Sequence, residues 1–68
     1  MSFISFLGLY AGRTAQEWSS KATEWAIKGS YGNANSAAYN YARALLGNEA
    51  SFDQVKRYAE ALLHNLFR

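Results

Sequence analysis

His64 is the only histidine in the chain, and the chain contains no cysteine. Histidine and cysteine side chains supply most zinc ligands, and histidine is the side chain best suited to transferring protons near neutral pH. One histidine without cysteine falls short of the three or four protein ligands of a usual zinc site. Helical spacing places His64 beside Glu60 and Arg68 on the charged side of a carboxyl-terminal helix. We therefore expect a surface histidine and no metal site.

The acidic residues and the serines are explained by local structure rather than by catalysis. The pair Thr14 and Glu17 and the pair Ser51 and Gln54 have the spacing of a capping box, in which each residue satisfies a backbone N–H of the other. Asp53 falls in the first turn of the second of these helices, where the helix dipole favours an anion. No two carboxylates share a predicted apolar pocket, and no serine has a base nearby in a recognised pattern. The sequence predicts neither enzymatic activity nor a cofactor.

The spacing of apolar residues predicts an all-α protein, built as a small antiparallel three-helix bundle in one domain. The three helices are expected at 14–28, 34–46 and 51–67. The glycine-containing stretches 29–33 and 47–50 are expected to connect them, and such short connections make neighbouring helices antiparallel. The chain has no proline, which agrees with uninterrupted helices.

An apolar segment at residues 2–11 is expected to add a fourth short helix or an arm. Its apolar residues come in pairs about every three positions, and only Ser5 and Gly8 form a polar strip. A helix of this length does not hold in isolation, so the segment must pack on something. It lacks the basic start of a secretory signal, and its apolar run is about half of the roughly 20 residues that a membrane-spanning helix needs. We therefore expect a cytoplasmic location.

The central helix, 34–46, carries a single charge, Arg43, and a helix without a strongly polar face is usually covered from more than one direction. Its inner face is expected to include Tyr41 and Leu45, and its outer flank Tyr39 and Leu46. The expected centre of the bundle consists of large apolar residues from all three helices: Trp18, Trp25, Tyr41, Leu45, Val55, Leu62 and Leu66.

The supply of apolar side chains exceeds what three short helices can easily hide. Half of the residues are hydrophobic, and they include two tryptophans, five tyrosines and four phenylalanines. Such a surplus indicates a protein-binding surface, for a second copy of the chain in a homodimer or for a larger target. The residues expected to contact a protein partner are Phe3, Ile4, Phe6, Leu7, Ile27, Tyr31, Tyr39, Arg43 and Leu46.

The function that these features favour is that of a small non-enzymatic regulator or inhibitor, acting through an apolar and aromatic helical surface. Host or defence modulators of phages and plasmids often have this format. Two alternatives belong to other classes. Nucleic-acid binding would use Lys56 and Arg57, and a membrane-active peptide would use the apolar amino terminus.

The charge pattern disfavours both alternatives. The net charge is only +2, and the basic residues alternate with acidic ones. In the first bundle helix the expected pairs are Glu17 with Lys21 and Glu24 with Lys28, in the favourable i,i+4 order. A phosphate-binding stripe or an anionic-lipid-binding face would need a continuous run of positive charge. Membrane association is thus not expected, and protein binding is preferred to nucleic-acid binding.

Overall fold

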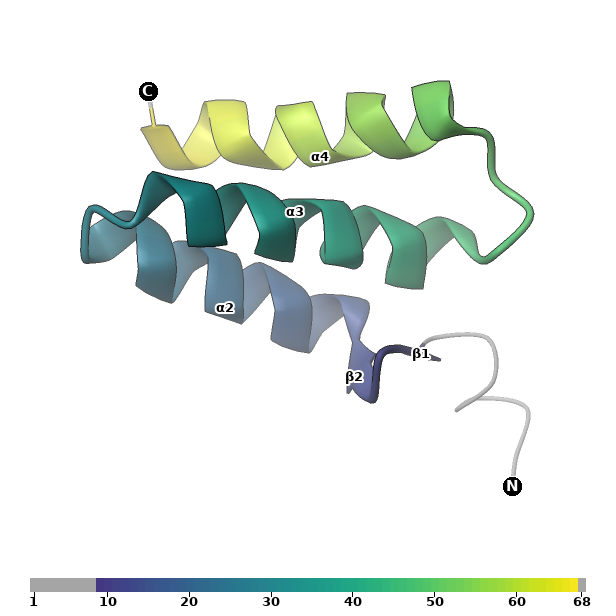
Figure 1. Cartoon of the computed structure of the whole chain (residues 1–68), viewed down its shortest axis with the longest axis horizontal. Helices are drawn as coiled ribbons and strands as arrows, with labels where there is room; N and C mark the ends of the chain where they lie inside the picture. The colour runs from purple at the N-terminus through teal and green to yellow at the C-terminus, as the bar shows by residue number, and fades with distance from the viewer. Residues whose placement is uncertain (1–8, 68) are drawn as a thin grey trace.

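The computed structural model describes residues 9–67 and confirms the predicted all-α three-helix architecture. Helix α2 spans Ala15–Ile27, α3 spans Tyr31–Leu46 and α4 spans Phe52–Phe67. Short turns join the helices, so successive helices run in opposite directions (Figure 1). Helix α3 lies in the middle, with α2 along one side and α4 along the other. Helices α2 and α4 contact each other only weakly.

The dimensions of the molecule show that the three helices form an open layer. Its principal extents are 36, 23 and 15 Å. Three helices side by side, with axes about 8–10 Å apart and Cα radii of about 2.3 Å, span roughly 21–25 Å. A closed triangle of helices would be narrower, at roughly 13–15 Å. The observed width of 23 Å, to which residues 9–14 also contribute, exceeds that of a closed triangle and agrees with the weak contact between α2 and α4.

Residues 9–14 form a tight β-hairpin that leads into α2. Strand β1, Leu9–Tyr10, pairs antiparallel with β2, Arg13–Thr14, and the two-residue turn between them has positive φ at Ala11 (51°) and Gly12 (82°). Two successive positive φ angles are the mark of a type I′ turn, whose twist matches that of paired strands. Of the two alternatives predicted for 2–11, a short helix or an arm, the helix is therefore wrong at 9–11. The remaining residues, 2–8, lie outside the described part of the chain, so the arm stays a prediction.

Both predicted capping boxes are present. The Glu17 backbone N–H donates to Thr14 Oγ1 at 3.1 Å, and the Thr14 N–H donates to Glu17 Oε1 at 2.8 Å. At the start of α4, the Gln54 N–H donates to Ser51 Oγ at 3.2 Å and the Ser51 N–H donates to Gln54 Oε1 at 3.1 Å. Each box satisfies backbone donors that the first turn of a helix leaves without a partner, which fixes where α2 and α4 begin.

Helix α3 begins at Tyr31, three residues before the predicted position. Helix α2 ends in a Schellman motif around Gly29, whose φ of 79° suits glycine. The Gly29 N–H donates to the Ala26 carbonyl, and the Ser30 N–H donates to the Trp25 carbonyl, at 3.0 and 2.9 Å. This motif reverses the chain within three residues, so α3 starts immediately afterwards and includes part of the stretch expected to be a flexible connection.

The helices contact each other through alanines. Apart from Trp18 and Val55, every buried side chain in the described residues belongs to an alanine. Ala22 of α2 packs with Ala37 and Ala44 of α3, while on the other side of α3 two further alanines pack with Val55 and Ala59 of α4. Because a methyl group takes little room, α3 can approach both α2 and α4 closely.

The predicted centre of the bundle is only partly correct. Trp18 and Val55 are buried as expected, and Trp25, Tyr41, Leu62 and Leu66 are half-buried beside the α2–α3 contact. The prediction for Leu45 is wrong, because 48% of this residue is exposed. The reason is geometric: α2 and α4 lie on opposite sides of α3 and do not close over the face that carries Leu45.

The close contact between α3 and α4 gives a test. Ala42 is fully buried, so Ala42→Leu must either separate the helices or distort them, at a cost of about 1–3 kcal/mol in the free energy of unfolding. Ala61 on α4 is exposed, and Ala61→Leu is the matched control with an expected change below about 0.5 kcal/mol. Urea unfolding of both variants at one protein concentration measures the difference. Equal stabilities would contradict the close contact.

Candidate protein-binding surface

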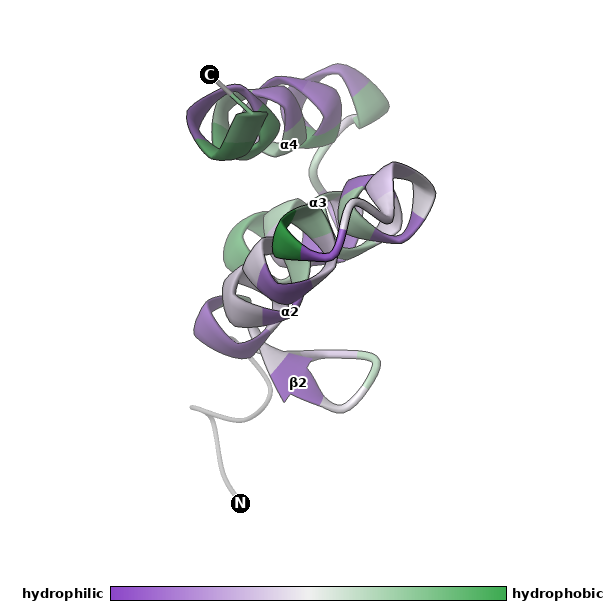
Figure 2. Ribbon diagram, turned by 90° about the vertical axis from the view of Figure 1, so that its left-hand side faces the viewer, coloured by the Kyte–Doolittle hydropathy of each residue, from purple (hydrophilic) through white to green (hydrophobic). Residues whose placement is uncertain are grey.

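One side of the helical layer gathers large apolar side chains from all three helices. Leu62 and Leu66 of α4 reach the α2–α3 contact, where Trp25 and Tyr41 also pack, so these four residues lie where α2 and α4 face each other across α3. We call this surface the apolar side and define it by six residues: Trp25, Tyr41, Leu45, Tyr58, Leu62 and Leu66. In Figure 2 the hydrophobic segments of α3 lie toward the left, those of α4 lie mainly on its lower side, toward α3, and hydrophilic segments mark the outer edge of α4.

Leu45 and Tyr58 extend the apolar side along two helices. Leu45 follows Tyr41 by one helical turn, and Tyr58 precedes Leu62 by one turn, so each continues the row of its neighbour. Leu45 is 48% exposed and Tyr58 is 45% exposed, whereas the other four residues of the apolar side are half-buried. Single exposed apolar residues are common on proteins, but a contiguous group on one side marks an interaction surface.

The edge of the apolar side on α2 is positively charged. The Lys28 ammonium group lies 5.3 Å from the centre of the Trp25 ring, a cation–π arrangement. None of the six residues that define the apolar side is charged. An apolar centre with a polar edge is the usual composition of a protein-binding surface.

The hairpin covers the other tryptophan of α2. The Trp18 Nε1–H donates to the Tyr10 carbonyl at 2.7 Å, and the Arg13 guanidinium lies 4.8 Å from the centre of the Trp18 ring. These contacts explain why Trp18 is only 9% exposed although it lies on the same flank of α2 as Trp25. The sequence contains no Asn-Gly or Asp-Gly dipeptide at this turn, so the usual hairpin signal is missing.

The structure gives Arg43 a local role. Its Nη1 donates to the Ala50 carbonyl at 3.1 Å, and longer contacts reach the Gly47 and Asn48 carbonyls at 3.4 and 3.5 Å. All three acceptors belong to the α3–α4 turn, so the guanidinium satisfies backbone oxygens at the end of a helix. The predicted role of Arg43 in contacting a partner stays a prediction.

Two further predicted contact residues, Tyr39 and Leu46, lie against the α3–α4 contact and are half-buried. The Tyr39 ring stacks on Phe52 with ring centres 6.2 Å apart, and Phe52 itself is 63% exposed. These residues lie together, but they are partly covered by α4, so the area that they can offer a partner is small.

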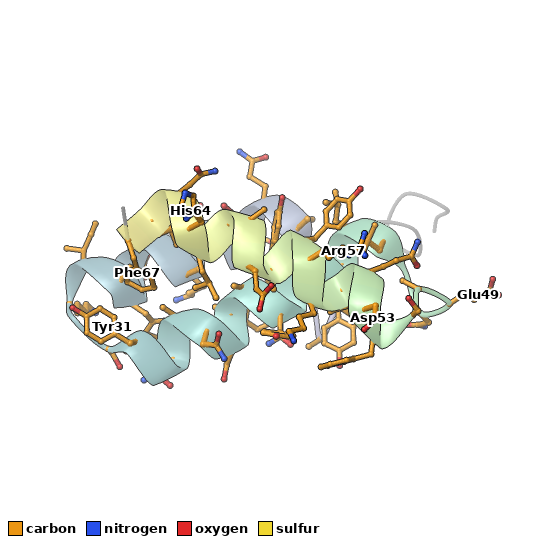
Figure 3. The ribbon with its side chains drawn as sticks, turned by 90° about the horizontal axis from the view of Figure 1, so that it is seen from above. Tyr31, Glu49, Asp53, Arg57, His64 and Phe67 are labelled. Carbon is orange, nitrogen blue, oxygen red and sulfur yellow. The ribbon has the colours of Figure 1, made fainter. Side chains whose placement is uncertain are left out.

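Ile27 and Tyr31 lie at the turn between α2 and α3 and are strongly exposed, at 81% and 63%. The Tyr31 ring meets the edge of Phe67 from α4, with ring centres 5.0 Å apart, and Figure 3 shows the two rings together at the end of the layer. Ile27 lies on the flank of α2 opposite Trp25, away from the apolar side. The other predicted contact residues, Phe3, Ile4, Phe6 and Leu7, lie outside the described residues.

The acidic residues and the histidine of the described part of the chain are all exposed. His64 is exposed on the outer surface of α4, the surface that also carries Asp53 and Arg57 (Figure 3). Within residues 9–67, no group of three or more His, Asp or Glu residues is arranged to hold a metal ion.

A shallow polar depression of about 330 Å³ lies on the outer face of α2, beside the hairpin. Glu17 in its wall is engaged in the capping box, and Lys21 and Glu24 form an ion pair at 3.8 Å. The predicted i,i+4 pairs are wrong, because Glu17 turns back to Thr14 and the Lys28 ammonium lies over an aromatic ring. The depression is therefore lined by charged groups that stabilise α2.

Comparisons of this chain with protein-family models, with curated proteins and with solved structures give no match. Among the helices described, none combines the length and the apolar character needed to cross a membrane. The functional argument therefore depends on the arrangement of this chain's own residues.

The local role of Arg43 can be separated from a role in binding. Arg43→Met keeps much of the aliphatic side chain but removes the donors, so we expect a loss of about 1–2 kcal/mol in the free energy of unfolding. Lys56→Met, on an exposed position of α4, is the control and should change stability by less than about 0.5 kcal/mol. Thermal or urea unfolding measures both. Unchanged stability of Arg43→Met would mean that the guanidinium is not needed for the turn.

Proposed function

We propose that this protein is a non-enzymatic protein-binding regulator that acts through the apolar side of its helical layer. The observation that carries the proposal is the position of the large side chains. The buried contacts between helices use alanines, while Leu45 and Tyr58 remain nearly half exposed beside two aromatic residues on one surface. A protein partner that covers this surface removes apolar area from water.

The residue types on the apolar side suit protein binding. Tryptophan and tyrosine provide large contact areas with few rotatable bonds, and they are enriched among the residues that dominate binding energy. Full burial of a large apolar side chain contributes about 1.5–3 kcal/mol, so covering two residues that are about half exposed adds roughly 1.5–3 kcal/mol together. The remaining affinity would come from the half-buried aromatic residues and from contacts at the edge.

The absence of a chemical centre among the described residues agrees with a binding role. His64 and the acidic residues of α4 are on its exposed surface, and the polar depression on α2 is lined by groups engaged in local contacts. Among the described residues, Lys21 pairs with Glu24, and Arg13 and Lys28 lie over tryptophan rings. Lys56 and Arg57 are exposed on α4, where Asp53 and Glu60 are exposed as well, so their positive charge is offset. These arrangements favour a protein partner over nucleic acid.

Site-specific photo-crosslinking tests the proposal. A photoreactive phenylalanine analogue replaces Tyr58, and in a parallel variant it replaces Ile27, in cells that naturally make the protein. We expect a protein adduct from position 58 that is resistant to nuclease, and little adduct from position 27. Adding Leu45→Lys should lower the yield from position 58 about tenfold, which corresponds to about 1.4 kcal/mol of lost binding energy.

Two results would contradict this function. An adduct only from position 27 would place binding at the α2–α3 turn. A product from position 58 that nuclease destroys would indicate a nucleic acid instead of a protein.

A further inference from the structure

The apolar side of the helical layer is where a second layer of secondary structure would be expected. Protein domains are generally built from two packed layers around one core, because a helix that is apolar along one stripe must bury that stripe against another element. Here α2 and α4 flank α3, and among the described residues no helix lies over the stripe that contains Tyr41 and Leu45. The described residues thus supply one layer and half of a core.

We infer that a second copy of this chain covers the apolar side, so that two helical layers pack face to face about a twofold axis. The inference rests on the proposed function, because it names the partner of the same surface. In such a dimer, Leu45 and Tyr58 of each copy become part of a shared core, together with Trp25, Tyr41, Leu62 and Leu66.

The size of the layer fits this partner. The whole molecule, with longer extents of 36 and 23 Å, has an outline of about 800 Å², and each partner contributes about this area to a standard protein–protein interface, so a face-to-face dimer reaches that size only if the polar edges of the layer also make contact. A second copy has the same outline, so the two layers match in length and width. Contacts much smaller than this are usually too weak to persist in solution.

The chemistry of the surface is self-complementary. A twofold interface brings the same patch of both copies together, so an apolar patch meets an apolar patch and a charged patch would meet its own charge. No charged residue belongs to the apolar side, and Lys28 lies only at its α2 edge. Asp53, Arg57 and His64 lie on the outer surface of α4, where they stay in water in a face-to-face dimer.

A second copy is favoured over a foreign protein by the weakness of the core in one chain. No large side chain among the described residues is fully buried, and the buried contacts are made mainly by alanines. A chain of 68 residues without cysteine has neither the size nor the disulfides that stabilise small domains, and oligomerisation is the usual remedy. The partner that completes the core must be available whenever the chain folds, and a second copy always is.

Sedimentation equilibrium over a range of protein concentrations tests the inference. The expected mass is twice the chain mass of 7.6 kDa. Leu45→Lys is expected to raise the dimer dissociation constant about tenfold or more, since it places a charge in an apolar interface. Ile27→Lys is the matched control, because it also replaces an exposed apolar residue in the last turn of a helix, where a cation is favoured. Ile27 lies away from the apolar side, on the flank of α2 opposite Trp25. This control should leave the dissociation constant within about twofold.

The melting temperature gives a second measurement on the same samples. Because the dimer couples folding to association, the melting temperature of the unmodified chain should rise with protein concentration, and that of Leu45→Lys should rise less. Tyr58→Lys serves as a second disrupting variant if Leu45→Lys loses its helical circular dichroism.

Each remaining outcome decides against the inference in a distinct way. A monomer that still forms the position 58 adduct with a different protein overturns the dimer and leaves the proposed function standing. A monomer without any adduct contradicts both. A dimer broken by Ile27→Lys and not by Leu45→Lys places the interface elsewhere. A dimer that forms only after removal of residues 1–8 identifies that segment as the occupant of the apolar side and overturns the inference.

Discussion

The close approach of α3 to both of its neighbours is the interaction on which the rest of the structure depends. Alanines at the two contacts let the helix axes come together, and this leaves no room between helices for the large side chains. Trp18 and Val55 are the larger residues that are nevertheless buried, Trp18 with help from the hairpin. The aromatic residues and leucines are therefore displaced to the surfaces of the layer.

This displacement explains both the shape of the molecule and its binding surface. With α2 and α4 on opposite sides of α3, each of these two helices buries its alanines against α3 without needing the other, and the layer stays open. The large residues then gather on the side where α2 and α4 face each other. Leu62 and Leu66 extend from α4 toward α2 and pack on the α2–α3 contact. Leu45, one turn after Tyr41, and Tyr58, one turn before Leu62, are left exposed. Packing at the alanine contacts thus produces the surface that we assign to protein binding.

The helices and their starting points could be predicted from the sequence because their signals are local. Capping boxes depend on residues three positions apart, and Thr14 with Glu17 and Ser51 with Gln54 adopt the predicted geometry. The predicted start of α3 is three residues late because only Gly29 indicates, in the sequence, the Schellman motif that ends α2. The hairpin was missed because Ala11 adopts a positive φ that alanine rarely takes.

The binding surface was less accessible to prediction because it depends on how helices are placed relative to one another. Periodicity identifies the apolar stripe of α3, but it does not say whether α2 and α4 close over that stripe. Leu45 was expected in the core for this reason, and it lies on the open side instead. Conversely, the flank that Arg43 shares with Tyr39 and Leu46 predicts a partner contact, whereas in the structure Arg43 donates to carbonyl oxygens of the α3–α4 turn. The exposure of Leu45 and the carbonyl contacts of Arg43 both depend on tertiary geometry.

The most direct test of the account is a measurement of which apolar side chains touch water in solution. A soluble paramagnetic agent broadens the NMR signals of exposed groups and spares covered ones. If the apolar side is covered by a partner copy, the Leu45 methyl groups and the Tyr58 ring should be protected at high protein concentration, while the Ile27 methyl groups should be strongly broadened. Equal broadening at Leu45, Tyr58 and Ile27 at every concentration would contradict the claim that a second copy of the chain covers this side of the layer.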